Sequence, residues 1–426
     1  MIAAIASRIA NHRAHLPALR LWAGRGFWAV TDQALFAGTN FLVNILLARW
    51  LDPVEYGAFA VAYSIFLLLG TLHTGLWTEP MLVYGSGRFR ESFTAYQRIL
   101  LGYHWRFGAL VFLLFGLLAA TFWLLGQPPL ARSFAGLAVA APLVLYLWLV
   151  RRGAYVLLEP RFAAYAGLAY LAIFLGLVAF LYLIGWLDTT TALVCMGVSA
   201  WVAGVWVALR VRAAASDRDV GPTGGEVLAR HWGYGRWALL AGALSWIPGN
   251  IYFTVLPGAY GLKEAATLKA LSNLVMPVLH FNGALAGLFV PVFVRVRANG
   301  RLLPVVKRAL RILLVPPLVF LLGVLLAGET LMDWVYGGKY DAAGLSWLAL
   351  NPIMAAFTGT CGAVLRAVER PDRIVQVYAT TAAVSSTVGL ASVIWAGLTG
   401  AVFAIVATNA IAAFLFWHGA RRYTLS

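Results

Sequence analysis

Twelve long apolar stretches dominate this sequence and constrain its fold more than any other feature. Each is long enough to cross the roughly 30 Å hydrocarbon core of a bilayer, which takes about 17 to 25 helical residues. They lie at residues 27–48, 57–79, 99–125, 134–150, 162–187, 191–209, 237–256, 265–293, 312–335, 345–365, 374–396 and 400–418. Backbone groups in lipid must find hydrogen-bond partners within the chain, so such stretches fold as helices. We therefore predict an all-α polytopic membrane protein with twelve transmembrane helices.

The composition agrees with a chain that lies mostly in the membrane. Hydrophobic residues make up 62% of the sequence and charged residues 11%, whereas soluble proteins have roughly 45–50% and 25%. The two cysteines, Cys195 and Cys361, lie far apart within apolar stretches. This placement excludes a disulfide scaffold and a paired-thiol metal site.

The basic residues are distributed unequally between the two sides of the predicted bundle. Of the 32 Lys and Arg, two lie within spans and four lie on one side: Arg49, Arg132, Lys263 and Lys339. All others lie on the side that holds both termini. Because positive residues are retained on the cytoplasmic side, we predict that both termini are cytoplasmic. The net charge of +16 is thus a topological signal, and we expect no nucleic-acid partner.

The chain divides into two similar halves of six spans. Residues 24–29 (GRGFWA) recur 209 residues later as residues 233–238 (GYGRWA). With one inserted residue, the same alignment pairs Glu159 with Glu369. An even number of spans in each half makes the halves run in the same direction through the membrane. We therefore predict two six-helix lobes related by a pseudo-twofold axis along the membrane normal.

This repeat gives the predicted domains. Residues 1–24 form a basic surface segment, 25–210 the N-lobe with helices 1–6, 211–232 a cytoplasmic linker, 233–420 the C-lobe with helices 7–12, and 421–426 a cytoplasmic tail. Basic and polar residues interrupt the apolar residues of the surface segment, so we expect this segment to lie on the anionic membrane surface. A cavity between the two lobes is the expected transport site.

Polar residues on one face of the first span indicate such a cavity. Gln33, Asn40 and Asn44 are seven and four residues apart and share one helical stripe, with Asp32 beside it. An ionisable group in hydrocarbon costs roughly 2.5 to 3.5 kcal/mol, so Asp32 needs a partner or a role. Either Asp32 lines the cavity, or it forms an internal ion pair with Arg106 of the third span.

The eighth span carries a second polar stripe, formed by Lys269, Asn273 and His280. No carboxylate lies on this stripe to pair with Lys269. We therefore predict that the stripe lines the cavity, together with Arg106 and with Thr71 on a hydroxyl-rich face of the second span. Hydrogen bonds between helices are the alternative role for the uncharged residues.

Three segments carry recognisable landmarks. They are residues 46–59 (LLARWLDPVEYGAF), 334–343 (WVYGGKYDAA) and 362–372 (GAVLRAVERPD). The chain resembles the lipid-linked oligosaccharide (O-antigen) flippases, the polysaccharide-transporter branch of the multidrug/oligosaccharidyl-lipid/polysaccharide exporter superfamily. The resemblance covers nearly the whole chain, and its landmarks are topological and do not name a substrate.

The resemblance implies alternating access through a central cavity lined by helices one, two, seven and eight. Members of that family carry undecaprenyl-diphosphate-linked sugars from the inner to the outer leaflet. By similarity, Arg25 and Lys269 match positions where family members place cations that face the lipid diphosphate. A cation in a low-dielectric cavity attracts a diphosphate strongly, and Asn and Gln can hydrogen-bond sugar hydroxyls.

The same resemblance implies partners and a location. The expected partners are a lipid-linked oligosaccharide and membrane lipids, with other membrane proteins of polysaccharide assembly as further candidates. We expect a monomer in the bacterial cytoplasmic (inner) membrane. No phosphate-loop motif is present, so we expect no cofactor and transport that is either downhill or coupled to H⁺ or Na⁺. Asp32, His73 and His280 are the candidate protonation sites.

Two other classes of function share some of these features. A cation-coupled exporter of small amphiphilic drugs, from the same superfamily, would need an acidic and aromatic-rich cavity, whereas this sequence offers Lys269 and Arg106. A membrane-embedded sugar polymerase, ligase or glycosyltransferase would need a large outer loop or a cytosolic domain with paired carboxylates. The sequence has neither, so we expect a transporter and not an enzyme.

Overall fold

The computed structural model describes residues 2–215, 221–297 and 302–424, with side chains from Gly24 onward apart from those of residues 287, 288, 291 and 371. Within these ranges the chain is helical apart from turns, and it contains no strand. The predicted all-α fold is therefore confirmed.

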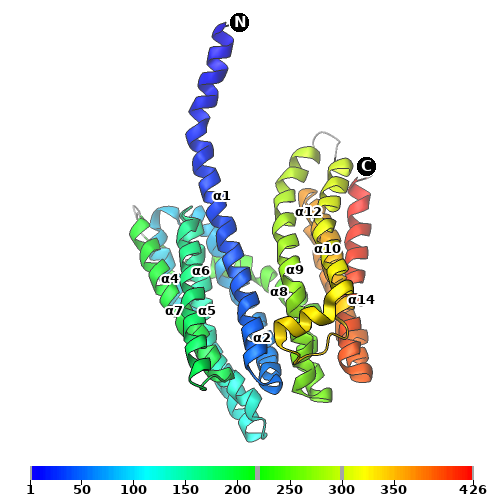
Figure 1. The fold of residues 1–426 in the computed structure, drawn as a ribbon. Helices are drawn as coiled ribbons and strands as arrows, with labels where there is room; N and C mark the ends of the chain where they lie inside the picture. The colour runs from blue at the N-terminus through cyan, green and yellow to red at the C-terminus, as the bar shows by residue number, and fades with distance from the viewer. Residues whose placement is uncertain (1, 216–220, 298–301, 425–426) are drawn as a thin grey trace.

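The first half of the chain contains helices α1 to α7 (Figure 1). They are α1 (Ile2–Trp50), α2 (Pro53–His73), the π-helical turn η1 (Thr74–Thr78), α3 (Glu79–Ser86), the 3₁₀ turn η2 (Arg90–Ser92), α4 (Phe93–Leu124), α5 (Pro128–Val156), α6 (Pro160–Leu183) and α7 (Thr189–Ala214).

The second half contains helices α8 to α14. They are α8 (Gly224–Tyr260), α9 (Leu262–Arg297), α10 (Leu302–Tyr336), α11 (Leu345–Leu348), α12 (Asn351–Ala367), α13 (Pro371–Val384), the π-helical turn η3 (Ser385–Gly389) and α14 (Leu390–Thr424).

Nine helical segments of the described chain are long and apolar enough to cross a membrane. The last of them, Asp372–Tyr423, contains both the eleventh and the twelfth predicted span, and Gly397 between these spans has a φ of +55°. Helices α1 and α9 lie where the first and eighth spans were predicted. Helix therefore occurs at every predicted span, and the number of twelve crossings remains a prediction.

Two helix starts are fixed by side-chain caps. The Asp52 carboxylate accepts a hydrogen bond of 2.8 Å from the Val54 N–H at the start of α2. Asp188 and Thr191 form a reciprocal capping box at the start of α7. Such caps satisfy N–H groups that have no partner inside the helix. Proline opens α2, α5, α6 and α13, where its missing N–H carries no penalty.

Glu55 connects three of these helix starts. Its carboxylate pairs with Arg132 near the start of α5 and accepts a 2.6 Å hydrogen bond from the Thr189 hydroxyl of α7. Glu55 belongs to the landmark segment 46–59. The structure thus gives this landmark a packing role at one end of the first half.

The backbone repeats at corresponding turns of the two halves. Leu158 and Glu369 have φ angles of +58° and +60°, and they are the positive-φ residues other than glycine in the described chain. Glu159 and Arg370, which follow them, have φ and ψ of −117°, 60° and −116°, 59°. The structure therefore pairs Leu158 with Glu369, and the predicted pairing of Glu159 with Glu369 is wrong by one residue. The ends of the preceding helices, Val156 and Ala367, already show the same offset of 211 residues, so the extra residue lies before the turn, where sequence identity is too weak to fix the register.

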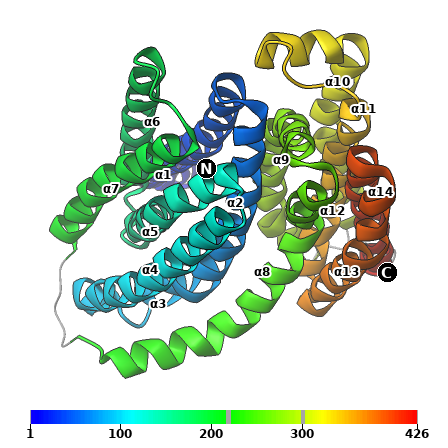
Figure 2. The same cartoon turned by 90° about the horizontal axis from the view of Figure 1, so that it is seen from below.

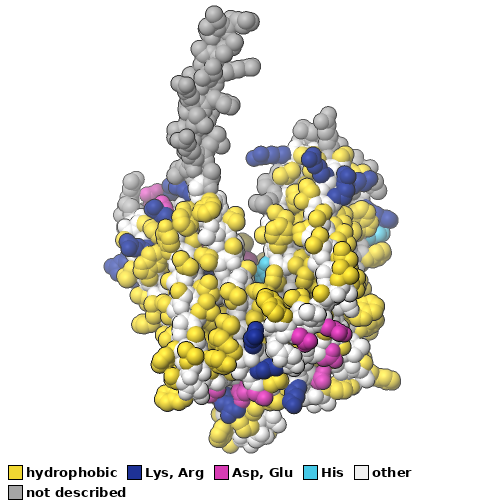
Figure 3. All heavy atoms as spheres, viewed as in Figure 1, with side chains coloured by type: hydrophobic (Ala, Val, Ile, Leu, Met, Phe, Trp, Pro, Cys, Tyr) yellow, Lys and Arg dark blue, Asp and Glu magenta, His cyan; other side chains and the backbone are white. Residues whose placement is uncertain are grey.

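The helices form two groups, α1–α7 and α9–α14, and α8 passes between them (Figures 1 and 2). Helix α8 packs against α2 and η1 in the first half and against α13 and α14 in the second. The start of α1 and the end of α14 lie on the same side of the bundle (Figure 1). Hydrophobic side chains cover most of the lateral face, and charged side chains gather toward its two ends (Figure 3).

The ends of the predicted domains fall differently in the structure. Helix α8 begins at Gly224, so residues 224–232 of the predicted linker belong to a helix. The side chain of Thr223 caps this helix by accepting a hydrogen bond from the Glu226 N–H. The side chains of the predicted surface segment 1–24, apart from Gly24, and residues 425–426 of the predicted tail lie outside the described part.

Candidate functional site

Two cavities adjoin each other: one of about 530 Å³ is lined by both halves, and one of about 220 Å³ is lined by the first half. They share Thr74 and Trp148, so we treat them as one central cavity. Its walls are formed by α1, α2, η1, α3, α5, α8 and α13. The residues that line it are Asp32, Gln33, Phe36, Leu67, Gly70, Thr71, Thr74, Gly75, Thr78, Glu79, Trp148, Arg151, Arg152, Tyr155, Ala238, Ala241, Gly242, Ser245, Trp246, Asn250 and Tyr378. Predicted cavity residues Asp32, Gln33 and Thr71 are among them.

Asp32 is fully buried at the wall of this cavity. One carboxylate oxygen pairs with the Arg151 guanidinium at 2.6 Å, and the other accepts a 2.6 Å hydrogen bond from the Tyr155 hydroxyl. Arg151 also lies over the Phe36 ring, 4.8 Å from its centroid. The negative charge of Asp32 is therefore compensated inside the fold.

The ion pair between Asp32 and Arg106, which was the alternative to cavity lining, is not formed. Arg106 is exposed on α4, and its guanidinium lies over the Tyr103 ring at 5.5 Å. It lines neither part of the central cavity. The ion pair forms with Arg151 instead, because the side chains of Arg151 and Tyr155 on α5 reach Asp32, whereas Arg106 lies against the Tyr103 ring on α4.

Sequence reasoning missed both Arg151 and Arg152. It ended the fourth span at residue 150, where the apolar stretch stops, and so assigned both arginines to a loop. The structure continues α5 to Val156, which places them on the cavity wall. Arg152 lies over the Tyr155 ring at 5.7 Å and forms no ion pair with a carboxylate of the described chain. The absence of Gly and Pro from residues 143–152 was the signal that could have found them.

Glu79 is a third residue whose place at the cavity was not predicted. It was predicted in the last turn of its span, yet the helix continues through η1 and α3 to Ser86. Glu79 therefore lies within a continuing helix and lines the cavity. The π-turn η1 inserts an extra residue into the helical ladder, as such turns often do at functional sites, and it carries Thr74 and Thr78 to the cavity.

Glycines allow α8 to pass close to η1 and α2. A Cβ atom on Gly235 would lie 2.9 Å from the Gly75 carbonyl oxygen, and one on Gly242 would lie 2.4 Å from Thr71 Cγ2. Side chains at these positions would push α8 away. The close packing holds Trp246, whose indole N–H donates to the Ser64 carbonyl at 2.9 Å, at the cavity wall.

A second polar cluster joins α1, α2 and α9. We call it the inter-lobe cluster, and it consists of Asn40, Asn44, Tyr63, Lys269 and Asn273. The Tyr63 hydroxyl donates to Asn40 Oδ1 at 2.9 Å, and Asn44 Nδ2 donates to the Asn40 carbonyl at 2.8 Å. Asn273 Nδ2 donates across the lobes to the carbonyl of residue 41 at 3.4 Å. Four predicted residues thus come together, in a place separate from the Asp32 ion pair.

Lys269 is the charged member of the inter-lobe cluster and is only 8% exposed. Its ammonium lies over the rings of Tyr63 and Phe253, at 5.1 and 5.7 Å. It forms no ion pair with a carboxylate in the described ranges. Aromatic rings attract a cation through their negative faces, so this cluster can hold a buried lysine without an acidic partner.

The remaining predicted residues lie outside both parts of the central cavity. Arg25 is half-buried near the described start of the α1 side chains. His280 is exposed on α9, and its Nδ1 lies 2.9 Å from the Met276 carbonyl. His73, a candidate protonation site, is fully buried and its Nε2 lies 3.0 Å from His104 Nδ1.

The two halves touch closely at the end where α1 stops. Lys339 Nζ donates to the carbonyls of Arg49 and Leu51 at 2.6 and 3.0 Å. A Cβ atom on Gly57 would lie only 1.9 Å from the Leu262 carbonyl oxygen. We call this set of contacts the closed end. On the opposite side, the surface is open between the two groups of helices (Figure 3).

Solved structures with this arrangement are known. The chain is similar to an inward-facing structure of a multidrug resistance MATE family transporter of the MOP superfamily, with a TM-score of 0.75 and 15% identity, over 93% of this chain and 98% of that one. An outward-facing structure of a MATE family transporter gives a TM-score of 0.67 and 14% identity, over 93% and 94%. A MOP superfamily transporter from Pyrococcus furiosus, described as having a binding pocket of reversed polarity, gives 0.66 and 14%, over 93% and 94%.

The fold, with a cavity between its two halves, is the fold of solved transporters of the MOP superfamily, the multidrug/oligosaccharidyl-lipid/polysaccharide exporters. Residues 46–345 match the family described as Polysaccharide biosynthesis protein. The chain belongs to this family, the polysaccharide-transporter branch of the superfamily. No curated protein matches the chain in sequence.

Proposed function

We propose that this transporter is a flippase that moves a lipid-linked saccharide precursor, carried on undecaprenyl diphosphate, across the bacterial cytoplasmic membrane. The observation that carries the proposal is Arg152, a cation on the cavity wall that pairs with no described carboxylate. A guanidinium in such a site is suited to bind a diphosphate. The family match to polysaccharide biosynthesis supports the same substrate class.

The cavity wall also suits a saccharide. Trp148, Tyr155, Trp246 and Tyr378 offer aromatic rings with polar tips, and such side chains combine apolar surface with hydrogen-bonding capacity. Asn250, with the hydroxyls of Thr71, Thr74 and Ser245, can hydrogen-bond sugar hydroxyls. A cavity bounded by both halves, with one closed end, is the geometry that alternating access requires.

Transport by variants of one arginine tests the proposal. Undecaprenyl-diphosphate oligosaccharide is supplied to reconstituted vesicles, and its movement is measured for the wild type, Arg152→Gln and the control Arg106→Gln, which removes an exposed arginine from α4. We expect Arg152→Gln to lose about tenfold or more of the transport rate, because charge-assisted contacts contribute about 1.5–3 kcal/mol. We expect the control to keep its rate. Equal transport rates for Arg152→Gln and the wild type would contradict the proposal that Arg152 binds the diphosphate.

A second candidate function is the export of small amphiphilic cations in exchange for H⁺ or Na⁺. It is favoured by Glu79, an exposed carboxylate on an aromatic-lined cavity, and by the fold shared with multidrug transporters. Asp32 contributes less to this function because Arg151 neutralises it. Two results together would favour this exporter over the flippase. The wild type would export a fluorescent cation from vesicles without moving the lipid, and Glu79→Gln would lose this efflux.

A further inference from the structure

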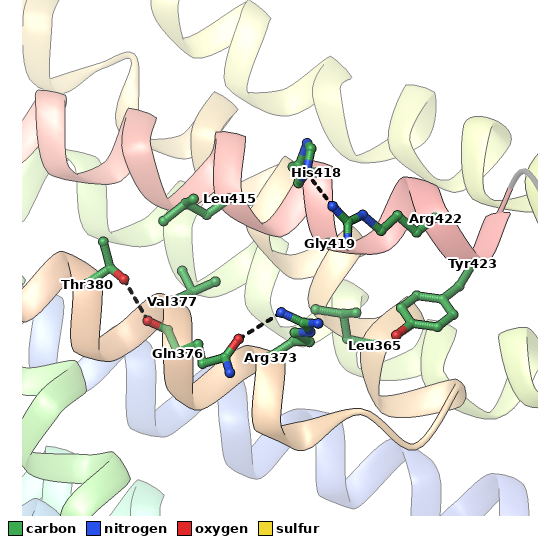
Figure 4. Close-up of a pocket in the computed structure, with 10 residues that line it drawn as sticks. All are labelled: Leu365, Arg373, Gln376, Val377, Thr380, Leu415, His418, Gly419, Arg422 and Tyr423. Atoms are coloured by element: carbon green, nitrogen blue, oxygen red, sulfur yellow. Dashed lines mark hydrogen bonds between the residues drawn. The ribbon is translucent and has the colours of Figure 1, made fainter.

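A groove of about 210 Å³ lies between α13 and α14, away from the central cavity (Figure 4). Arg373 and Gln376 of α13 line one side, and His418 and Arg422 of α14 line the other (Figure 4). The groove shares no lining residue with the central cavity. Helix α13 separates the two, since its neighbouring residue Tyr378 lines the central cavity.

The groove is basic. Among the residues that line it, two are arginines and none is acidic. Asp372, a described carboxylate beside the groove, accepts two hydrogen bonds of 2.9 and 2.7 Å from the Arg370 guanidinium and forms an ion pair of 3.8 Å with Arg373. Arg422 donates to His418 Nε2 at 3.2 Å. The described residues at the groove therefore include three arginines and one carboxylate.

The floor of the groove is apolar. Leu365 of α12, the buried Val377 of α13 and Leu415 of α14 lie among its lining residues. The groove runs from Leu415 to Tyr423 near the end of α14 at Thr424, which at 1.5 Å per residue is about 12 Å along the helix. It thus reaches from a helix end, where headgroups lie, into the region of the acyl chains.

Basic groups at the mouth and apolar groups at the floor match the parts of one ligand. We propose that this groove binds an anionic glycerophospholipid, with the phosphate between Arg373 and Arg422 and the first methylenes against Leu365, Val377 and Leu415. Arginine binds phosphate oxygens through paired N–H groups. Basic pockets between membrane helices bind lipid headgroups in this way. The apolar floor favours a lipid over a soluble phosphate, which has no methylenes to bury.

Binding of defined lipids to the full purified chain tests this site. The delipidated protein is titrated with phosphatidylglycerol, phosphatidylcholine or glycerol phosphate, and bound ligand is counted by native mass spectrometry. We expect phosphatidylglycerol to bind the wild type about tenfold or more tighter than phosphatidylcholine, and Arg373→Gln/Arg422→Gln to lose about tenfold or more of this affinity.

The control variant is Lys307→Gln/Arg308→Gln, which removes two exposed cations from α10 on the same side of the bundle. We expect it to bind as the wild type does. If the double variant in the groove does not fold, Arg422→Gln alone gives the same test, because the Arg422 side chain is exposed. Unchanged phosphatidylglycerol affinity in the groove variants would overturn the proposal. Displacement of phosphatidylglycerol by equal concentrations of glycerol phosphate would also overturn it, in favour of a soluble anion site.

Discussion

At the scale of single residues, the charged groups within apolar stretches are the informative ones. Asp32 and Lys269 were both found from the sequence, because each is costly in lipid without a partner. In the structure, the buried charges of these two residues are stabilised in different ways. Asp32 pairs with Arg151 and Tyr155, whereas Lys269 lies against the rings of Tyr63 and Phe253.

The buried ion pair between Asp32 and Arg151 leads to a stability prediction. Arg151→Leu leaves the Asp32 carboxylate buried with only the Tyr155 hydroxyl. We expect this variant to lose roughly 3–5 kcal/mol of unfolding free energy, as does removal of one partner of other buried pairs. The double variant Asp32→Leu/Arg151→Leu is expected to recover most of that loss, because it leaves no uncompensated charge. Denaturant titration followed by tryptophan fluorescence measures both values. Additive losses in the double variant would show that the two residues are not coupled.

At the scale of elements, helix length decided which residues reach the cavity. The apolar stretches give the positions of the helices, but α5 extends beyond its stretch to Val156, and α2 continues through η1 and α3 to Ser86. Polar residues can continue a helix because its hydrogen bonds are made by the backbone and do not depend on apolar side chains. Arg151, Arg152 and Glu79 lie on these continued segments.

Contact between α2 and α9 at the closed end gives a prediction about conformation. Gly57→Ala places a Cβ atom 1.9 Å from the Leu262 carbonyl oxygen, so the two helices must move apart. We expect the population with the closed end intact to fall. Spin labels at Trp186→Cys and Trp334→Cys, both exposed in the wild type, measure this change as longer distances between the halves.

The matched control is Gly102→Ala on α4, where a Cβ atom meets nothing within 4 Å. This control should leave the distances unchanged and stabilise the helix by about 0.5–1 kcal/mol. Distances in Gly57→Ala that equal those of the wild type would show that the closed end tolerates the added methyl group.

At the scale of the whole molecule, the proposed orientation rests on the distribution of Lys and Arg. The start of α1 and the end of α14 lie on one side of the bundle (Figure 1), which agrees with an even number of crossings. The cytoplasmic location of both termini remains a proposal, as do the inner membrane and the monomeric state.

Labelling by a thiol reagent that does not cross membranes tests this orientation. Gln127→Cys, exposed between α4 and α5, should react in intact cells, and Ala213→Cys, exposed near the end of α7, should react only after the membrane is opened. The native Cys195 and Cys361 are buried and should give little background. The reverse pattern of labelling would invert the proposed topology.

The sequence by itself determined the helical class, the places of the helices and the family resemblance. These depend on the length and hydrophobicity of stretches along the chain, which are local properties. It also found the residues of the inter-lobe cluster on α1 and α9, because a polar stripe on an apolar helix is visible without its neighbours.

Only the tertiary structure decided which polar residues meet. It paired Asp32 with Arg151 instead of Arg106, brought Lys269 to two aromatic rings, and joined two adjoining cavities through Thr74 and Trp148. The physical reason is that such contacts depend on which helices pack side by side and at what depth. A chain that is apolar on most helix faces does not encode those neighbours in any single stretch.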